Sequence, residues 1–540
     1  MKTLSTLVAI VLLHASALAQ FQIRYSTQNY DWPTSLDRDD KGYIVAGSTL
    51  SGSWNPFLLR LDNNGSWLWS YTYNLPGIDE LFLDVTNVDW SAQPQYAAVG
   101  QADAAPGGAL GVDEYFIMTN SSGVPIALKR FVTPETDVAR HIESIKHPLY
   151  GPGFVITGYT YHNQTTLEKD INILITNNVG NLVKSAVLHA PLNQEAHAVE
   201  FTKDGGFIIT AETELAQTCD KKDVNVLIVR LDSQLKVLWS YTFDFVPGNT
   251  TSDDKAYIAK EDQNGEIQVA GTSRIYVNGV YDHDEPFQLH LKSDGNPVWL
   301  KRYNVDTYPS AEVVSLVNKT ADDGSIINVL SGRTYQNFEA LLFQTDYKGD
   351  PVWARTYPPN YSGNSTNAED LIENEIKGYS FTGRMFNAVS PSTSYDIHVV
   401  ETDSNGKSGE ACEKEVKVLA KEEKLCQDKL DFQITTMRQL TISTDNIKIA
   451  LKANKCEDAS VSSLLEQSNI IPNPGENIIS IAGFTTGSVV SFFDQQGLLK
   501  KKSNFATDEK IDVSDLPSGV YIVELIQADG SVNNYRFIKQ

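Results

Sequence analysis

The chain is dominated by short runs rich in β-branched and aromatic residues, separated by turns of glycine, asparagine and aspartate. "GYIVAGST" (42–49) and "GFVITGYT" (153–160) are two examples, and similar runs occupy 96–102, 206–213, 266–273, 327–334 and 378–385. Runs of this length and composition, bounded by turn residues, are typical of β-strands. The pattern therefore predicts an all-β protein built from many short strands.

A second block follows most of these runs at a fixed distance. Residues 61–73, "LDNNGSWLWSYTY", contain a turn, a tryptophan four residues after its glycine and a tyrosine eight residues after it. Residues four apart in a strand point to the same face. Matching turns recur every 54 to 60 residues, with their anchors at Gly65, Gly123, Gly180, Leu235, Gly295, Gly349 and Gly406. The aromatic residues at the two offsets are Trp69, Trp239, Trp299 and Trp353, then Tyr73, Phe131, Phe243, Tyr303 and Tyr357.

Each repeat holds four predicted strands: an inner strand such as 196–201, the glycine-ended run, a strand such as 224–232, and the aromatic strand after the turn. Such repeats are typical of β-propeller blades, and seven turns predict seven blades over residues 20–411. The seventh repeat lacks an outer strand, whereas residues 21–26, "FQIRYS", place two aromatic residues four apart. We therefore expect the N-terminal strand to complete blade seven and close the ring. The repeated tryptophans are interpreted as packing residues between blades; a stacking platform for sugars is the alternative.

The turn with tryptophan four residues after glycine resembles the blade motif of the quinoprotein-like propellers. The whole repeat is also similar to propellers of exported Bacteroidota proteins. Quinoprotein alcohol dehydrogenases usually have eight blades and a vicinal cysteine pair near a calcium-bound cofactor, whereas this chain has seven predicted blades and no adjacent cysteines. The resemblance therefore implies the fold and not that activity.

Residues 469–540 show a different pattern, with alternating runs that predict a small antiparallel, Ig-like β-sandwich. The order of its motifs resembles the C-terminal sorting domain of the type IX secretion system. The residues that carry the resemblance are Pro472, Asn473, Pro474, Gly497, Gly519, Tyr521 and Lys539. The resemblance implies the type IX secretion machinery as a partner and passage across the outer membrane. Removal of the domain and anchoring to surface lipopolysaccharide often follow.

The first 19 residues have the features of a signal peptide. A lysine at position 2, an apolar run over residues 4–13 and small residues at 17–19 predict cleavage between Ala19 and Gln20. The apolar run is shorter than the roughly 20 residues that cross a bilayer, which argues against an uncleaved anchor. We therefore expect a mature protein without a transmembrane segment, secreted or held at the outer-membrane surface after passing through the periplasm.

The 540-residue chain has a formal net charge of −24, which argues against a nucleic-acid partner because phosphates attract basic surfaces. Residues 412–468 carry charged and strand-like runs and predict an extended β-linker between the two domains. All four cysteines follow the signal peptide, where disulfides can form. We favour a Cys412–Cys456 disulfide and leave Cys219 and Cys426 unassigned.

The sequence lacks the motifs of common hydrolases, nucleotide-binding proteins and metal centres, so no catalytic residue or metal ligand is assigned. One acidic residue stands near the start of each inner strand: Asp31, Glu80, Asp137, Glu195, Asp254, Glu312 and Glu369. Inner strands line the channel of a propeller, so these carboxylates could gather at one mouth and bind calcium or a basic group. Alternatively, each acid accepts hydrogen bonds from backbone amides and stabilises the contact between blades. No other cofactor is predicted.

Two functions of different class are compatible with these features. The first is a surface or secreted binding protein whose propeller face holds a glycan, peptide or matrix partner. The second is an exported hydrolase or lyase that acts on a polysaccharide or peptide in the channel mouth. The absence of a recognisable nucleophile or metal motif favours the first, although propeller active sites are assembled from several blades and need no local motif.

Overall fold

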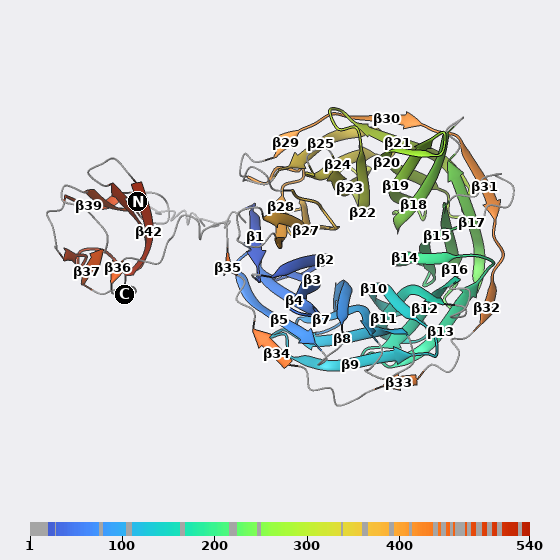
Figure 1. Ribbon diagram of the computed structural model, residues 1–540, viewed down its shortest axis with the longest axis horizontal. Helices are drawn as coiled ribbons and strands as arrows, with labels where there is room; N and C mark the ends of the chain where they lie inside the picture. Colours follow the sequence, from blue (N-terminus) through green and yellow to red (C-terminus); the bar gives the residue numbers. More distant parts are fainter. Residues whose placement is uncertain are drawn as a thin grey trace, which may run out of the picture. The chain divides into compact units, whose positions relative to one another are not determined.

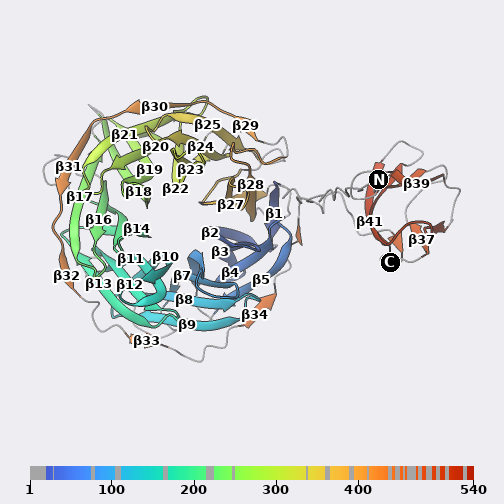
Figure 2. The same cartoon turned by 180° about the vertical axis from the view of Figure 1, so that it is seen from behind.

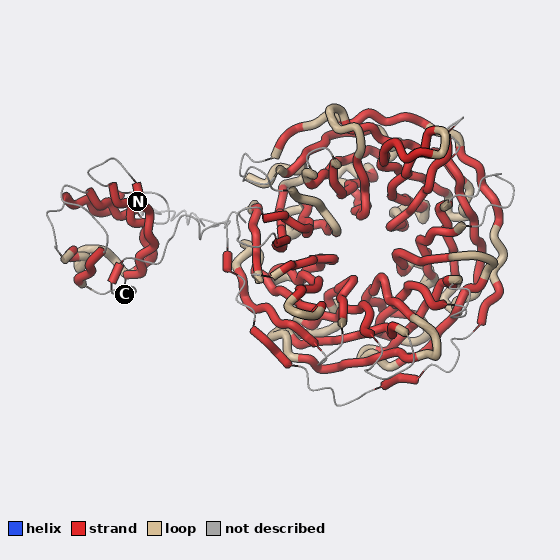
Figure 3. Tube along the Cα trace, in the orientation of Figure 1, coloured by secondary structure: helices blue, strands red, loops and turns tan. Residues whose placement is uncertain are grey.

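The computed structural model forms two compact units, residues 1–456 and 457–540. The elements are β-strands joined by turns and loops (Figure 3). Among the described residues, no helix is long and apolar enough to cross a membrane. The structure describes residues 20–539 apart from 28, 75–78, 104–110, 162–167, 215–223, 246–249, 336–337, 359–364, 388–393, 410–412, 436–440, 444–449, 454–456, 459–469, 472–476, 482–488, 494–498, 505–509 and 527–531.

The first unit is a seven-bladed propeller, with antiparallel sheets arranged in a ring (Figure 1). The strands of blades 1 to 3 are β2 (Tyr30–Asp39), β3 (Gly42–Leu50), β4 (Trp54–Asp62), β5 (Trp67–Asn74); β6 (Glu80–Asn87), β7 (Gln95–Asp103), β8 (Val112–Asn120), β9 (Pro125–Val132); and β10 (Asp137–His147), β11 (Gly151–Tyr161), β12 (Lys169–Asn177), β13 (Leu182–His189). Those of blades 4 to 6 are β14 (Gln194–Phe201), β15 (Phe207–Thr213), β16 (Asn225–Leu231), β17 (Val237–Phe245); β18 (Thr250–Glu261), β19 (Ile267–Val277), β20 (Val280–Leu291), β21 (Pro297–Val305); and β22 (Ala311–Thr320), β23 (Ile326–Thr334), β24 (Ala340–Asp346), β25 (Pro351–Tyr357).

Blade 7 joins the two ends of the propeller chain. It contains β26 (Asp370–Glu373), β27 (Tyr379–Asn387) and β28 (Ser394–Thr402), followed in the sheet by β1 (Gln22–Ser26). Strand β1 runs antiparallel to β28, with pairs from Gln22↔Val400 to Tyr25↔Ile397. The predicted closure by the N-terminal strand is therefore confirmed.

The repeated turn is the point where each blade contacts the next. All six anchor glycines have positive φ values of 72° to 82°, and Leu235 takes the same conformation with a φ of 64°. The aromatic residues of the preceding blade cover these turns closely. A Cβ atom on Gly349 would lie 2.6 Å from the Trp299 ring, and one on Gly406 would lie 2.5 Å from Trp353. Glycine is thus needed both for the backbone conformation and for the close approach of the ring.

Hydrogen bonds from the aromatic strand reinforce this contact. The hydroxyl of Tyr73 donates to the carbonyl of Gly123 at 2.8 Å, and that of Tyr303 donates to Gly349 at 3.0 Å. Tyr25 of β1 makes the same bond to Gly65, across the seam of the ring. The indole N–H of Trp69 donates to the carbonyl of Ser121 at 2.9 Å. The repeated aromatic residues therefore hold the next blade's turn in place.

Residues predicted as a linker instead lie along the rim of the propeller (Figures 1 and 2). This segment, here called the belt, adds one outer strand to each of blades 6, 5, 4, 3, 2 and 1 in turn, opposite to the order of the blades in the sequence. Its strands are β29 (Lys414–Glu415), β30 (Val418–Glu422), β31 (Leu425–Lys429), β32 (Gln433–Thr435), β33 (Thr441–Ser443) and β34 (Ala450–Ala453). Outer edges of blades carry unpaired backbone groups, and the belt provides partners for them.

The second unit is a small β-sandwich. A three-stranded sheet contains β36 (Ile470–Ile471), β37 (Ile478–Ile481) and β40 (Ile511–Asp512), and a four-stranded sheet contains β39 (Leu499–Asn504), β38 (Val489–Phe493), β41 (Gly519–Ile526) and β42 (Val532–Lys539). Strand β35 (Glu457–Asp458) precedes these two sheets and belongs to neither of them. Ile479 and Ile511 of one sheet share a buried core with Phe492 and Val523 of the other.

Candidate functional site: the channel and its mouth

The seven predicted acids do not occupy one register position. A β-bulge interrupts the inner strand in each of blades 1 to 6 and gives a common reference point for comparing positions. The residue two positions before the start of the bulge is, in blade order, Asp31, Glu80, Asp137, Gln194, Asp254 and Ala311. Glu195 and Glu312 stand one residue further along, and Glu369 directly precedes β26. Since neighbouring residues of a strand point to opposite faces, a shift of one position moves a carboxylate to the other face. The acids thus form two sets.

The first set, Asp31, Glu80, Asp137 and Asp254, is fully buried. Asp31 accepts a hydrogen bond from the backbone N–H of Thr27 at 2.8 Å, and Asp254 accepts one from Phe245 at 3.1 Å. Burial raises the pKa of Asp31, Asp137 and Asp254 to about 7 in each case. These contacts match the structural interpretation, in which each acid binds neighbouring amides and hydroxyls.

In the second set, each carboxylate is paired with a cation. Arg140 lies 2.5 Å from Glu195, Arg333 lies 2.6 Å from Glu312, and Arg384 lies 2.7 Å from Glu369. Lys169 also binds Glu195. Although burial opposes its ionisation, these cations lower the pKa of Glu195. The cations compensate these carboxylates only in part, because burial and the neighbouring charge of Glu369 still raise the pKa of Glu312.

The channel itself is a cavity of about 490 Å³ lined by residues from all seven blades. Its ionisable lining was not predicted as a site, because Asp37, Asp84, Glu143 and Glu200 follow the bulge instead of starting the strand. The lining includes Asp37, Asp84, His141, Glu143, Glu200, Lys260 and Asp370. The Lys260 ammonium lies 2.7 Å from Glu200.

Most channel carboxylates bridge adjacent blades. Asp37 accepts a hydrogen bond from the backbone N–H of Asn87 at 2.7 Å, and Asp84 accepts one from Ile142 at 2.8 Å. Glu143 binds the N–H of Phe201 at 2.8 Å in the same way. These acids therefore have a structural role at the blade contacts.

Burial shifts the pKa values of several ionisable side chains in the channel. Burial raises the pKa of Asp37 and of Asp84 to about 6. Burial and the neighbouring charge of Glu200 raise the pKa of Glu143. Burial lowers the pKa of His141 to about 4, so its imidazole is neutral at pH 7. Carboxyl groups that keep a proton near neutral pH are candidates for acid–base chemistry.

An aromatic patch lies beside the mouth, where blades 1 and 7 meet. The patch comprises Tyr30, Trp32, Trp54, Phe386 and Tyr395, with ring centroids of neighbours 4.9 to 6.1 Å apart. The guanidinium of Arg384 lies 4.3 Å from the Trp32 ring centroid and 5.8 Å from that of Tyr395. Trp32 keeps 37% of its surface exposed. The patch therefore presents partly exposed aromatic rings, inclined to one another, next to a cation.

A small cavity of about 90 Å³ adjoins this patch. It is lined by Arg333, Phe338, Ser365, Thr366, Asn367, Arg384 and Tyr395. Asn367 donates a hydrogen bond to Glu369 at 2.6 Å, and Phe338 is 46% exposed. Exposed rings and polar side chains converge here, a combination typical of ligand sites. No local pattern in the sequence indicates this cavity, because its lining comes from separate segments of blades 6 and 7 between Arg333 and Tyr395.

Some of the other residues predicted from the sequence lie outside the part of the chain that the structure describes. Those are Ala19, Cys412, Cys456, Pro472, Asn473, Pro474 and Gly497. The disulfide therefore stays a prediction. Gly519 begins β41, and the hydroxyl of Tyr521 donates to the carbonyl of Pro517 at 2.8 Å. Lys539 ends β42.

Comparison with known families identifies the end of the chain. Residues 469–540 match the family described as the secretion system C-terminal sorting domain. The propeller unit is thus followed by a type IX sorting domain. This domain implies the type IX machinery as a partner and export to the cell surface or the extracellular space. No curated protein sequence matches the chain significantly.

Solved structures resemble the chain only distantly. The polysaccharide lyase Uly1 has a TM-score of 0.44 at 8% identity and covers 71% of this chain and 100% of its own. The extracellular domain of a putative hybrid two-component system from B. thetaiotaomicron has a TM-score of 0.22 at 10% identity, covering 96% of this chain and 100% of its own. Function must therefore be argued from the site.

Proposed function

We propose that the protein is an exported glycan-binding protein and that the glycan binds on the aromatic patch and its adjoining cavity. The observation that carries the proposal is Arg384, which lies over Trp32 and Tyr395 while it pairs with Glu369. Exposed aromatic residues and arginine are the residues that dominate binding energy at recognition surfaces. The sorting domain supports this role, because it directs the propeller to the space where extracellular glycans occur.

The charge pattern favours a neutral glycan over an anionic one. Arg384 is compensated by Glu369, and Arg333 by Glu312. Each pair still offers N–H donors and carboxylate acceptors at its edges. Sugar hydroxyls both donate and accept, so they match such paired groups. A polyanion would instead meet a protein with a net charge of −24.

The test compares two equally exposed tryptophans. Trp32 is 37% exposed in the patch, and Trp67, at the start of β5 and at the opposite end of the strands, is 40% exposed. A glycan array would first identify a ligand for the purified full chain, and calorimetry would measure its affinity. Trp32→Ala should weaken binding at least tenfold, whereas Trp67→Ala should not. Equal affinities for the two variants, or no binding to any neutral glycan, would contradict the proposal.

Catalysis is the second candidate, and the channel acids support it. Glu143 has a raised pKa and lies in the same cavity as Glu200 and Lys260. Glycoside hydrolysis uses two carboxyl groups, one of which has a raised pKa and acts as the general acid. A panel of polysaccharide substrates should then reveal activity that Glu143→Gln abolishes. If the panel shows no turnover, the binding function stands alone.

A further inference from the structure

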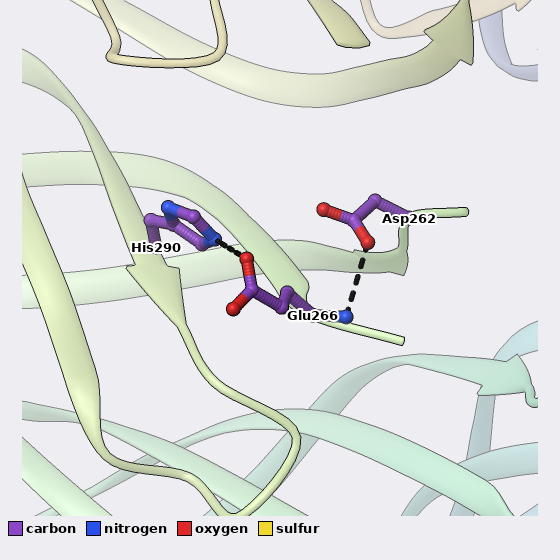
Figure 4. Close-up of side chains that lie close together, drawn as sticks. All are labelled: Asp262, Glu266 and His290. Atoms are coloured by element: carbon purple, nitrogen blue, oxygen red, sulfur yellow. Dashed lines mark hydrogen bonds and ion pairs between the residues drawn. The ribbon is translucent and has the colours of Figure 1, made fainter. Parts of the chain in front are cut away.

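Three potential metal ligands meet on blade 5 (Figure 4). Asp262 and Glu266 lie in the turn between β18 and β19, and His290 is on β20. One donor atom from each side chain lies within 4.8 Å of the other two. Asp262 is 1% exposed and His290 is fully buried, so the group is part of the blade interior.

The corresponding position in two other blades is an arginine. Arg60 pairs with Trp69 across the strands of blade 1, and Arg230 pairs with Trp239 in blade 4. Each guanidinium lies 2.6 Å from an aspartate beside this turn: Asp39, which ends β2, or Asp204, two residues after Thr202, the backbone counterpart of Asp262.

In blade 5 the residue opposite Trp299 is His290. The side chain of histidine is shorter than that of arginine and carries no guanidinium. The turn of blade 5 therefore lacks the guanidinium that blades 1 and 4 supply.

One carboxylate oxygen in this group of three side chains makes no hydrogen bond with any residue that the structure describes and could bind a metal ion. One oxygen of Asp262 accepts the backbone N–H groups of Asn264 and Glu266 at 2.8 and 3.0 Å. Its other oxygen is buried and has no hydrogen-bond partner among the described residues. The Nε2 atom of His290 lies 3.0 Å from a Glu266 oxygen, and Tyr347 donates to that same oxygen. An unpaired buried carboxylate oxygen is costly.

We propose that Asp262, Glu266 and His290 bind a divalent transition-metal ion, which takes the place of the missing guanidinium. Two carboxylates and one imidazole suit zinc, whereas calcium and magnesium prefer oxygen ligands alone. The Glu266 side chain is 27% exposed, which gives the ion a route from solvent and a position for water. The bound ion would join the turn to β20 and, through Tyr347, to blade 6.

The experiment uses the full chain after dialysis against a chelator. Zinc titration by calorimetry should show one site, cobalt should give a visible absorption spectrum, and zinc should raise the melting temperature. His290→Arg restores the arginine of blades 1 and 4, so it should fold without metal and lose the zinc-dependent rise. Asp262→Asn should weaken zinc binding at least tenfold. Asp204→Asn, in the arginine-paired turn of blade 4, should leave the zinc response unchanged.

Several outcomes would overturn the inference. Zinc binding that is unchanged in His290→Arg would place the ion at another histidine. A melting temperature insensitive to zinc, or one raised equally by calcium and by zinc, would show that the three side chains form only a hydrogen-bonded network. The glycan-binding proposal does not depend on this site, so the two can fail separately.

Discussion

The belt offers the sharpest test of the architecture through Leu430, which follows β31. Leu430 is 2% exposed and belongs to the buried core shared by blades 3 and 4. Its backbone N–H donates to the carbonyl of Ser240 at 3.2 Å, and its carbonyl accepts from the Ser240 hydroxyl. Leu430→Ala removes the side chain and leaves these backbone bonds possible. The substitution therefore weakens the docking of the belt by packing alone.

The expected cost follows from this burial. Replacing a fully buried leucine by alanine costs about 2–5 kcal/mol, and the cost depends on how far the site can collapse. Leu430 lies near the rim, where the belt can move inward, so we expect the lower half of that range. Leu419, on β30, is the matched control because it is 48% exposed. Leu419→Ala should change the free energy of unfolding by less than about 0.5 kcal/mol.

Urea unfolding followed by tryptophan fluorescence measures both variants. Limited proteolysis with trypsin adds a local measure, because Lys421, Lys424 and Lys429 lie in the belt near Leu430. Leu430→Ala should shift the unfolding midpoint to lower urea and accelerate cleavage in the belt. The same midpoint and the same cleavage rate for both leucine variants would refute the docking of the belt onto the blades.

Four further predictions concern single contacts and processing. Tyr303→Phe removes the hydrogen bond to the Gly349 carbonyl and should lower the free energy of unfolding by about 1 kcal/mol in urea titrations; an unchanged value would show that the hydroxyl does not stabilise the blade contact. The raised pKa of Glu143 means that the folded state binds more protons than the unfolded state. The contribution of Glu143 to the free energy of unfolding is therefore complete below the unfolded pKa and is lost as the pH rises through the folded pKa. Between about pH 5 and pH 9, the window around a raised carboxyl pKa, the free energy of unfolding should fall less in Glu143→Gln than in the unmodified protein. The same pH dependence of unfolding in both proteins would argue against a raised pKa of Glu143. Mass spectrometry of non-reduced peptides should find Cys412 linked to Cys456, and a Cys412–Cys426 peptide would exclude that pairing. Removal of residues 470–540 should leave a folded propeller in the periplasm of a type IX-competent host, and its display at the cell surface would contradict the sorting role.

The blades were predictable because each repeat carries its own local signals. A turn with positive φ needs glycine at almost every anchor, and the ring that packs on it needs an aromatic residue at a fixed offset. Leu235 stands where the other repeats have glycine. The intervals to the neighbouring turns still indicated the repeat, and Leu235 has the same positive φ as the glycines. The N-terminal strand was recognisable for the same reason, since Phe21 and Tyr25 repeat the aromatic offset.

The belt was not predictable from local pattern. Its strands have only two to five residues, and each pairs with a partner far away in the sequence, as Leu451 does with Tyr73. Such short strands show no measurable alternation. The register positions of the seven acids were not predictable for a related reason. Glu195 and Asp254 look equivalent in sequence, but they differ by one register position, which only the pairing of β14 with β15 and of β18 with β19 reveals.

The aromatic patch depends on the closure of the ring, which connects the fold to the proposed function. Trp32 and Trp54 come from blade 1, whereas Arg384 and Tyr395 come from blade 7, and these two blades are adjacent only because the ring is closed. Strand β1 supports that seam, where Tyr25 binds the Gly65 turn. A ligand on the patch would contact both sides of the seam and would bind only the closed ring. It would therefore stabilise the closed state in proportion to its concentration over its dissociation constant, so ligand binding and ring closure are thermodynamically linked.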